Sequence, residues 1–325
     1  MKKFVLLLTA AVLLLSVCAP VTAENQPVKI VTTIFPIYDW VRQVVGPDAN
    51  VDMTMLLDSG VDLHNYQPTA QDILKIAQCD LFIFVGGESD EWTEDVLATA
   101  QNKNIKTINL LDALGEAVKE EEIVEGMEAE HEHGEDHDHD HEEEEEIEYD
   151  EHVWLSLRNA EKLVGVIADA LAEIDAEHAD AYRANAEDYL EKLQDLDAQY
   201  AETVNAAAYK TVLFGDRFPF RYLVDDYGLA YYAAFTGCSA ESEASFQTIL
   251  FLAQKLDELG LPAVLTIENP KTRMPETIVA SSQAKNQKIL AMNSMQGVTA
   301  QEVKAGADYL AIMEENLRVL REALN

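Results

Sequence analysis

The stretch VKIVTTIFPIYDWVRQVVG, from Val28 to Gly46, joins two patterns that together indicate a fold class. Its first part, residues 28–35, is a short run rich in β-branched residues, which predicts a strand. Its second part, residues 36–45, opens with a proline, which suits the first turn of a helix. A strand that leads at once into a helix predicts a βαβ unit and a parallel sheet.

The same rhythm continues along the chain in two sets of four strands. The first set adds strands at 51–57, 80–86 and 105–111, with helices at 69–77 and 90–100. The second set has strands at 209–215, 228–235, 262–268 and 288–293, with helices at 217–226, 244–259, 275–284 and 301–324. The sequence therefore predicts an α/β protein with two parallel-sheet lobes.

Two further helices are expected between the sets, at 159–174 and 176–205. The second has neither Gly nor Pro, and about thirty residues at ~1.5 Å each span roughly 45 Å, enough to brace both lobes. An ordinary surface helix is the alternative. We expect an N-terminal lobe over 27–175, a bridging helix over 176–205 and a C-terminal lobe over 206–325.

The net charge and the N-terminus restrict the partners and the location. A formal charge of -37 argues against nucleic acid and anionic membranes as ligands and favours a cation or a neutral molecule. Residues 1–23 are predicted to be a signal peptide, with Lys2 and Lys3 before an apolar run and small residues up to Ala23. Lipid attachment at Cys18 is the alternative to cleavage near Ala23. Either places the protein in the periplasm or at the cell surface.

Residues 120–151 hold 19 acidic residues, five histidines and no Lys or Arg. Such a segment has too little apolar content to offset its ordering entropy, so we expect a mobile insertion. His137, His139 and His141 with their neighbouring carboxylates make a weak, flexible chelator for zinc, copper or nickel. A solvated acidic loop is the alternative.

Candidate metal ligands follow the predicted strands, because ligands bind beyond the carboxyl ends of parallel strands. These residues are His64, His152, Asp216 and Glu268. Imidazole and carboxylate donors from both lobes would form a cation site between them. Each candidate has a simpler alternative. A histidine can serve only as a hydrogen-bonding residue, Asp216 can pair with Arg217 or Arg221, and Glu268 can cap the turn that follows its strand. Cys79 and Cys238 are too few for a disulfide scaffold, and their pairing is left open.

Several motifs resemble those of the metal-specific solute-binding proteins of bacterial ABC importers, the zinc- and manganese-uptake family. They are TTIFPIYDWVRQVVG, GVDLHNYQPTAQD, the His-rich acidic insertion, DEHVWLSLRNA and YLVDDYGL. The resemblance implies two four-stranded lobes bridged by one rigid helix, with a metal ion held between them and passed to a membrane permease. The insertion just before the second histidine motif is typical of the zinc-specific branch.

The resemblance makes His64 and His152 the first two ligands. Gly215 stands where relatives carry His or Glu, and Ser156 and Leu157 replace the usual Asp-Pro. Either Asp216 or Glu268 therefore completes the shell, or the site is partly open to water or to a loop histidine. The His-rich insertion favours Zn²⁺ over Mn²⁺.

The sequence thus predicts a monomeric zinc-binding protein that delivers its ion to an ABC transporter permease and is not an enzyme. A secreted zinc metallohydrolase is one alternative, since two histidines and a carboxylate also build catalytic zinc sites, but no His-Glu-x-x-His motif supports it. A surface protein that buffers metal or mediates cell adhesion is the other.

Overall fold

The structure is a computed structural model, and it describes residues 26–47, 49–100, 102–127, 148–239, 244–268 and 273–325. The predicted signal peptide and the five histidines between residues 131 and 141 lie outside the described residues. None of the helices in the described ranges is both long and apolar enough to cross a membrane.

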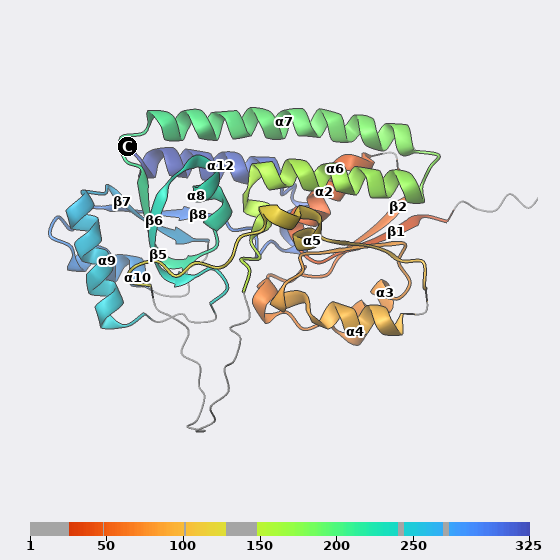
Figure 1. Cartoon of the computed structure of the whole chain (residues 1–325), viewed down its shortest axis with the longest axis horizontal. Coiled ribbons are helices and arrows are strands. Elements are labelled where there is room, and N and C mark those ends of the chain that lie inside the picture. Colours follow the sequence, from red (N-terminus) through yellow and green to blue (C-terminus); the bar gives the residue numbers. More distant parts are fainter. Residues whose placement is uncertain (1–25, 48, 101, 128–147, 240–243, 269–272) are drawn as a thin grey trace, which may run out of the picture.

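The first lobe is a parallel sheet with strand order β2-β1-β3-β4. Because β2 and β3 lie on opposite sides of β1, the strand order reverses there, and ligands bind beyond the carboxyl ends of strands at such a point. Helices α2 and α6 lie above the sheet and α3 and α4 below it (Figure 1). The bounds are β1 Val28–Thr32, α2 Phe35–Val45, β2 Val51–Met55, α3 Ala70–Ile76, β3 Leu81–Phe84, α4 Trp92–Thr99, β4 Lys106–Asn109, α5 Leu110–Leu114 and α6 Leu157–Ile174.

The second lobe repeats this plan with strand order β6-β5-β7-β8, again all parallel. Helices α9 and α10 pack together beside β5 and β6, and α12 packs against β7 and β8. The bounds are β5 Thr211–Phe218, α8 Arg221–Tyr227, β6 Ala230–Thr236, α9 Phe246–Leu259, β7 Ala263–Ile267, α10 Met274–Ser281, β8 Lys288–Met292, α11 Ala300–Lys304 and α12 Tyr309–Ala323. The predicted fold class, two parallel-sheet α/β lobes, is confirmed.

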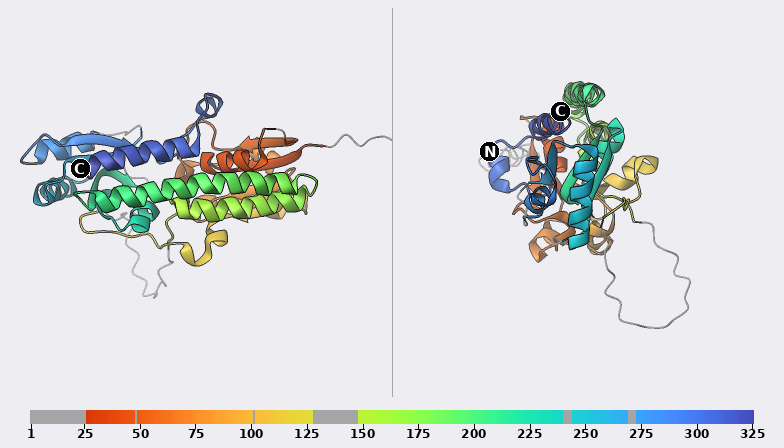
Figure 2. Two further views of the ribbon diagram at one scale, coloured as in Figure 1. Left: turned by 90° about the horizontal axis from the view of Figure 1, so that it is seen from above. Right: turned by 90° about the vertical axis from the view of Figure 1, so that its left-hand side faces the viewer.

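A single helix, α7 (Ala179–Ala206, 28 residues), runs along both lobes (Figure 2). At ~1.5 Å per residue it is about 42 Å long. It packs on α6 and α2 in the first lobe and on α8 and α12 in the second. One face buries Tyr182, Tyr189, Leu193, Leu196 and Tyr200, so the helix is part of the core rather than a linker. The helix begins three residues later than expected, and the division into domains stays a prediction.

Strand β5 is longer than predicted, and the helix after it starts later. The strand pairs with β6 as far as Phe218, with a shift of register between Phe214 and Arg217. This β-bulge lets the strand continue past Gly215, where we expected it to end. Helix α8 begins at Arg221 rather than at residue 217. The prediction was wrong here, and the consequence is that Arg217 lies on the strand end that faces the first lobe.

The predicted terminal helix at 301–324 is two helices, α11 and α12. Gly306 adopts a φ of +99° between them, and the Asp308 side chain accepts a hydrogen bond from the Ala311 N–H at the start of α12. A residue in this backbone region ends the first helix and an N-cap starts the second, which the amphipathic pattern alone did not indicate.

Both described ends of the acidic segment 120–151 pack on the protein. Glu120 and Tyr149 form an antiparallel bridge. The Tyr231 hydroxyl donates to Glu122 at 3.0 Å, and Glu122 also pairs with Arg221. Residues in the described parts of the segment thus have charged and aromatic partners on the second lobe. The expectation of a mobile insertion stays a prediction.

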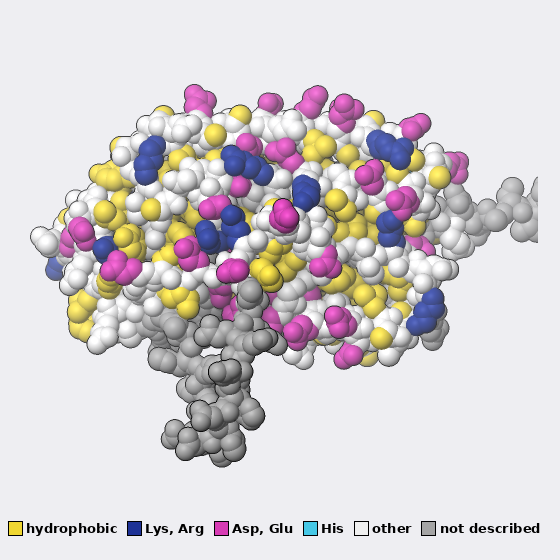
Figure 3. Space-filling model, in the orientation of Figure 1, with side chains coloured by type: hydrophobic (Ala, Val, Ile, Leu, Met, Phe, Trp, Pro, Cys, Tyr) yellow, Lys and Arg dark blue, Asp and Glu magenta, His cyan; other side chains and the backbone are white. Residues whose placement is uncertain are grey.

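The surface in Figure 3 carries charges of both signs, with Lys and Arg side chains between Asp and Glu. The segment 120–151 holds 19 of the 60 acidic residues of the chain. A large share of the negative charge is therefore concentrated in one segment rather than spread over the two lobes.

Candidate metal site

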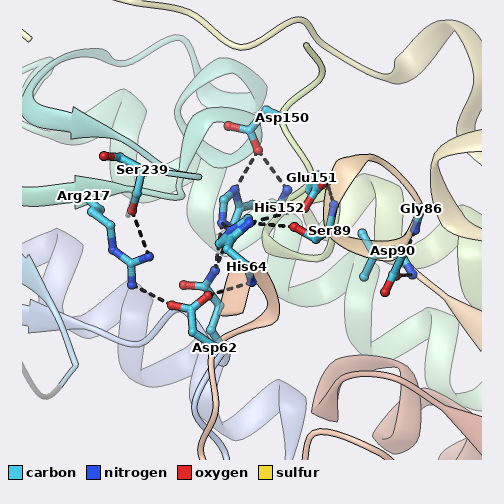
Figure 4. Close-up of polar contacts among 12 residues, drawn as sticks. Asp62, His64, Gly86, Ser89, Asp90, Asp150, Glu151, His152, Arg217 and Ser239 are labelled. Atoms are coloured by element: carbon cyan, nitrogen blue, oxygen red, sulfur yellow. Dashed lines mark hydrogen bonds and ion pairs between the residues drawn. The ribbon is translucent and has the colours of Figure 1, made fainter. Parts of the chain in front are cut away.

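Two histidines from distant parts of the chain meet where the lobes join. His64 lies in a short 3₁₀ turn, η1 (Leu63–Asn65), after β2, and His152 immediately precedes another, η4 (Val153–Leu155), before α6. Their Nε2 atoms are 3.2 Å apart (Figure 4). His152 is fully buried, and the His64 side chain is 9% exposed. The structure thus brings together the two histidines that the sequence singled out.

The outer nitrogen of each ring is held by a polar neighbour. His152 Nδ1 lies 2.9 Å from Asp150 Oδ1, and because a carboxylate only accepts, this nitrogen carries the proton. His64 Nδ1 lies 2.8 Å from the Ser89 hydroxyl and 3.4 Å from Glu151 Oε2. With a proton on each Nδ1, both Nε2 lone pairs face the same point, which is the usual arrangement of metal-binding histidines with carboxylate partners.

Burial keeps His64 in its neutral form. Loss of hydration, reinforced by the neighbouring His152, lowers the pKa of His64 to about 3. A neutral imidazole is the form that binds metal. The ring is therefore ready to coordinate an ion throughout the neutral pH range.

The turn that carries His64 is fixed by Asp62. One oxygen of this carboxylate accepts the His64 backbone N–H at 3.2 Å, and the other accepts Arg217 Nη2 of the second lobe at 2.7 Å. Burial alone would raise the pKa of Asp62, but the Arg217 guanidinium outweighs it and holds the pKa below its usual value. A charge-assisted contact between the lobes thus adjoins the first candidate ligand.

A glycine lets Glu151 approach the loop after β3. Glu151 Oε1 accepts the Ser89 N–H at 2.9 Å. Gly87 has a φ of +77°, and a Cβ at this position would lie 2.3 Å from that carboxylate oxygen. Any larger residue would displace Glu151 and, through it, the partners of His64. Burial raises the pKa of Glu151, opposed by its hydrogen bonds with Ser89.

Gln296, after β8, closes the space between the imidazoles. Its side-chain nitrogen lies 2.9 Å from His152 Nε2 and 3.2 Å from His64 Nε2. The Ser294 hydroxyl lies 3.2 Å from Gln296 Oε1 and 2.7 Å from Glu268 Oε1. A chain of polar contacts therefore links Glu268 to the histidines through Ser294 and Gln296.

The structure does not place Asp216 and Glu268 in the histidine cluster. Asp216 accepts the Thr266 hydroxyl at 2.7 Å and the Arg217 backbone N–H at 2.9 Å. Glu268 accepts both the N–H and the hydroxyl of Ser294, each at 2.7 Å. The Arg217 side chain pairs with Asp62 rather than with Asp216. Direct ligation by Asp216 or Glu268 stays a prediction.

Cys238 joins the histidines instead. Among the described residues, its Sγ forms a group with one ring nitrogen each of His64 and His152, all within 4.8 Å of one another. Both Cys238 and Cys79 are free thiols. Burial, and then the carboxylates of Asp150, Glu121 and Glu151, raise the pKa of the Cys238 thiol.

Cys238 and Gln296 are not among the ligands predicted from the sequence. Cys238 lies two residues beyond the end of β6, so the rule that selected the other candidates would have included it. Gln296 carried no signal, because an amide four residues past a strand is common in loops.

Comparisons with known proteins identify the relatives of this chain. The model of the family described as "Zinc-uptake complex component A periplasmic" matches residues 30–323. The zinc-binding lipoprotein AdcA of Streptococcus pneumoniae is 32% identical over 327 residues, 99% of this chain and 61% of that protein. The chain thus spans less than two thirds of the AdcA relatives. The high-affinity zinc uptake system protein ZnuA of Bacillus subtilis is 30% identical over 302 residues, 93% of this chain and 89% of that protein.

Solved structures are similar as well. The Zn(II)-bound ZnuA-like domain of S. pneumoniae AdcA matches with a TM-score of 0.69 and 28% identity over 92% of this chain and 99% of that one. The metal-dependent lipoprotein YcdH of B. subtilis matches with a TM-score of 0.72 and 25% identity over 91% and 99%. From the family match over nearly all of the described fold, the chain belongs to the family of zinc-uptake complex component A proteins.

Proposed function

We propose that this protein captures one zinc ion outside the cytoplasm and hands it to the permease of an ABC transporter, with His64 and His152 as ligands. The observation that carries the proposal is the distance of 3.2 Å between the two Nε2 atoms. A tetrahedral zinc ion with Zn–N bonds of ~2.0 to 2.1 Å holds two nitrogens about 3.3 Å apart. The two rings thus have the spacing that the ion requires.

The surroundings of the rings also support a metal-binding role. Asp150 and the Ser89–Glu151 pair orient the imidazoles from outside, as partners of zinc ligands commonly do. These acidic groups supply negative charge near a bound cation without occupying its coordination positions. Similar proteins that carry zinc-uptake names, such as ZnuA of B. subtilis, add support for zinc as the cargo.

Zinc titration of the purified mature protein against a competing chelator tests the proposal. We expect one tight site per molecule, lost in His64→Ala and in His152→Ala because each removes a ligand. His178→Ala is the control, since that histidine pairs with Asp175 at the start of α7, on a helix that contributes none of the candidate ligands. Tight binding that survives both ligand substitutions would refute the ligand assignment.

A variant without residues 128–147 separates the lobes from the acidic histidine segment. We expect it to keep one tight zinc ion, because His64 and His152 lie outside that segment. Loss of all tight binding would favour the buffering alternative. Delivery is tested separately, by zinc uptake into vesicles that contain the cognate permease, with and without the loaded protein.

The predicted roles of Asp216 and Glu268 can be tested in the same titration. If either carboxylate binds zinc directly, Asp216→Asn or Glu268→Gln should weaken binding as strongly as a histidine substitution. If they act only through Thr266 and Ser294, the loss should be smaller.

A further inference from the structure

The chain after β6 passes directly over the second histidine. Strand β6 ends at Thr236, and a Cβ on Gly237 would lie 2.7 Å from Cε1 and 2.9 Å from Nδ1 of His152. Only a residue without a side chain permits this approach. The close contact places the next residue, Cys238, beside the ring.

The sulfur of Cys238 lies near a ring nitrogen of each histidine. Its Sγ and one ring nitrogen of each histidine are all within 4.8 Å of one another. In a tetrahedral zinc site with Zn–S of ~2.3 Å and Zn–N of ~2.0 to 2.1 Å, a sulfur lies about 3.6 Å from each nitrogen. The separations in this group exceed those of a zinc site by no more than about 1 Å, and rotation of the cysteine side chain about χ1 moves its sulfur.

Other donors near the histidines already have partners. Asp150 and Glu151 face the outer nitrogens, and Asp62 pairs with Arg217. Asp216 and Glu268 accept hydrogen bonds from Thr266 and Ser294. The Gln296 amide nitrogen lies within 3.2 Å of both Nε2 atoms, and the Cys238 sulfur belongs to the same group of potential ligands as the two rings.

We infer that Cys238 supplies a thiolate as the third protein ligand of the zinc ion, an inference that rests on the proposed function of the site. On binding, the S–H bond is replaced by an S–Zn bond and the proton passes to solvent. Gln296, within hydrogen-bond distance of both imidazoles, completes the shell with its amide oxygen once the terminal amide turns. Thiolate sulfur is a poor ligand for manganese and a good one for zinc, so Cys238 also sets the selectivity of the site.

Cobalt and X-ray absorption measurements on the mature protein test this inference. With one equivalent of Co²⁺, we expect a near-ultraviolet thiolate-to-cobalt charge-transfer band in the wild type. The acidic histidine segment holds no cysteine, so metal bound there cannot produce this band. With one equivalent of zinc bound, the extended X-ray absorption fine structure at the zinc edge should show one sulfur atom at ~2.3 Å from the zinc ion.

Cys238→Ser should abolish the band and the sulfur signal and lower zinc affinity more than about tenfold, since loss of even an outer-shell partner costs that much. The substitution should also lower the ratio of zinc affinity to manganese affinity. Cys79→Ala is the matched control, because Cys79 is buried in the first lobe and outside the ligand group. It should keep the band.

The outcomes distinguish this inference from the proposed function. One tight ion with nitrogen and oxygen neighbours only, and no charge-transfer band in the wild type, would overturn the role of Cys238 and leave the zinc-capture proposal intact. Absence of any tight ion at the two histidines would overturn both. The wild-type spectra show by themselves whether a thiolate binds the metal, so the test holds even if Cys238→Ser folds poorly.

Discussion

The ion pair between Asp62 and Arg217 joins the two lobes beside His64, and it offers a quantitative test of how the site is held. The two side chains are 15% and 13% exposed, and their nearest N–O distance is 2.7 Å. The substitutions are Asp62→Asn, Arg217→Met and the two combined. Asparagine keeps an oxygen that can accept the His64 N–H while removing the charge.

The magnitude follows from the distance and the burial. At an effective dielectric constant of about 20, two unit charges 2.7 Å apart attract by roughly 6 kcal/mol. Loss of hydration offsets most of this attraction, which leaves a net coupling of about 2 kcal/mol, the range of a charge-assisted hydrogen bond. Each single substitution leaves the other charge buried without a partner and should lower the free energy of unfolding by about 3 kcal/mol. The double variant should therefore lose about 4 kcal/mol rather than 6.

Urea unfolding of the four proteins in the presence of a metal chelator gives the coupling energy. The pair Arg318 and Glu315 on the surface of α12 is the control, and it should show no measurable coupling because both side chains are largely exposed. If the losses at Asp62 and Arg217 simply add, to within about 0.5 kcal/mol, the contact does not hold the lobes together and the reasoning fails.

Three further substitutions probe the site and its support. Asp150→Asn should lower zinc affinity about 10- to 100-fold in a chelator competition, because a neutral amide orients His152 less firmly than a carboxylate; unchanged affinity would contradict that role. Burial raises the pKa of Asp90 to about 7 from 3.8, so its contribution to the free energy of unfolding should fall by up to about 4 kcal/mol between pH 4 and 7. Asp90→Asn should remove this fall in the free energy of unfolding between pH 4 and 7. If urea unfolding of the variant shows the same pH dependence as the wild type, the raised pKa of Asp90 is refuted. Gly237→Ala should push the His152 ring and weaken zinc binding, whereas Gly165→Ala on α6, where a Cβ meets nothing within 4 Å, should leave binding unchanged; equal affinities for both variants would contradict the close contact.

Much of the fold could be read from local pattern, because parallel strands buried on both faces give short apolar runs and their helices give a regular alternation. All eight predicted strands are present within a few residues. The errors fall where a backbone detail overrides the pattern. The bulge after Phe214 extends β5, and the turn at Gly306 divides the last helix. Neither feature alters hydrophobic periodicity, so pattern alone gives no warning of it.

Only part of the candidate site could be predicted from the sequence. His64 and His152 stand in recognisable motifs, and the structure places their rings in contact. Cys238 follows a strand end, as the other candidates do, but its contact with the histidines depends on the close approach of Gly237 to His152, which is visible only in three dimensions. The contacts at the ends of the acidic segment were not predicted for a related reason. They involve partners more than seventy residues away in the chain, such as Tyr231 and Arg221.

The long helix α7 has a consequence for how an ion can enter and leave. A wide hinge motion between the lobes would have to bend or shear a 28-residue helix that packs on α2 and α6 at one end and on α8 and α12 at the other. Shear of so much buried apolar surface is costly, whereas the short turns that carry His64 and Cys238 each belong to a few residues beyond a strand end. On the proposed function, we therefore expect zinc to enter and leave through small displacements of these turns, while α7 keeps the two lobes in a fixed arrangement.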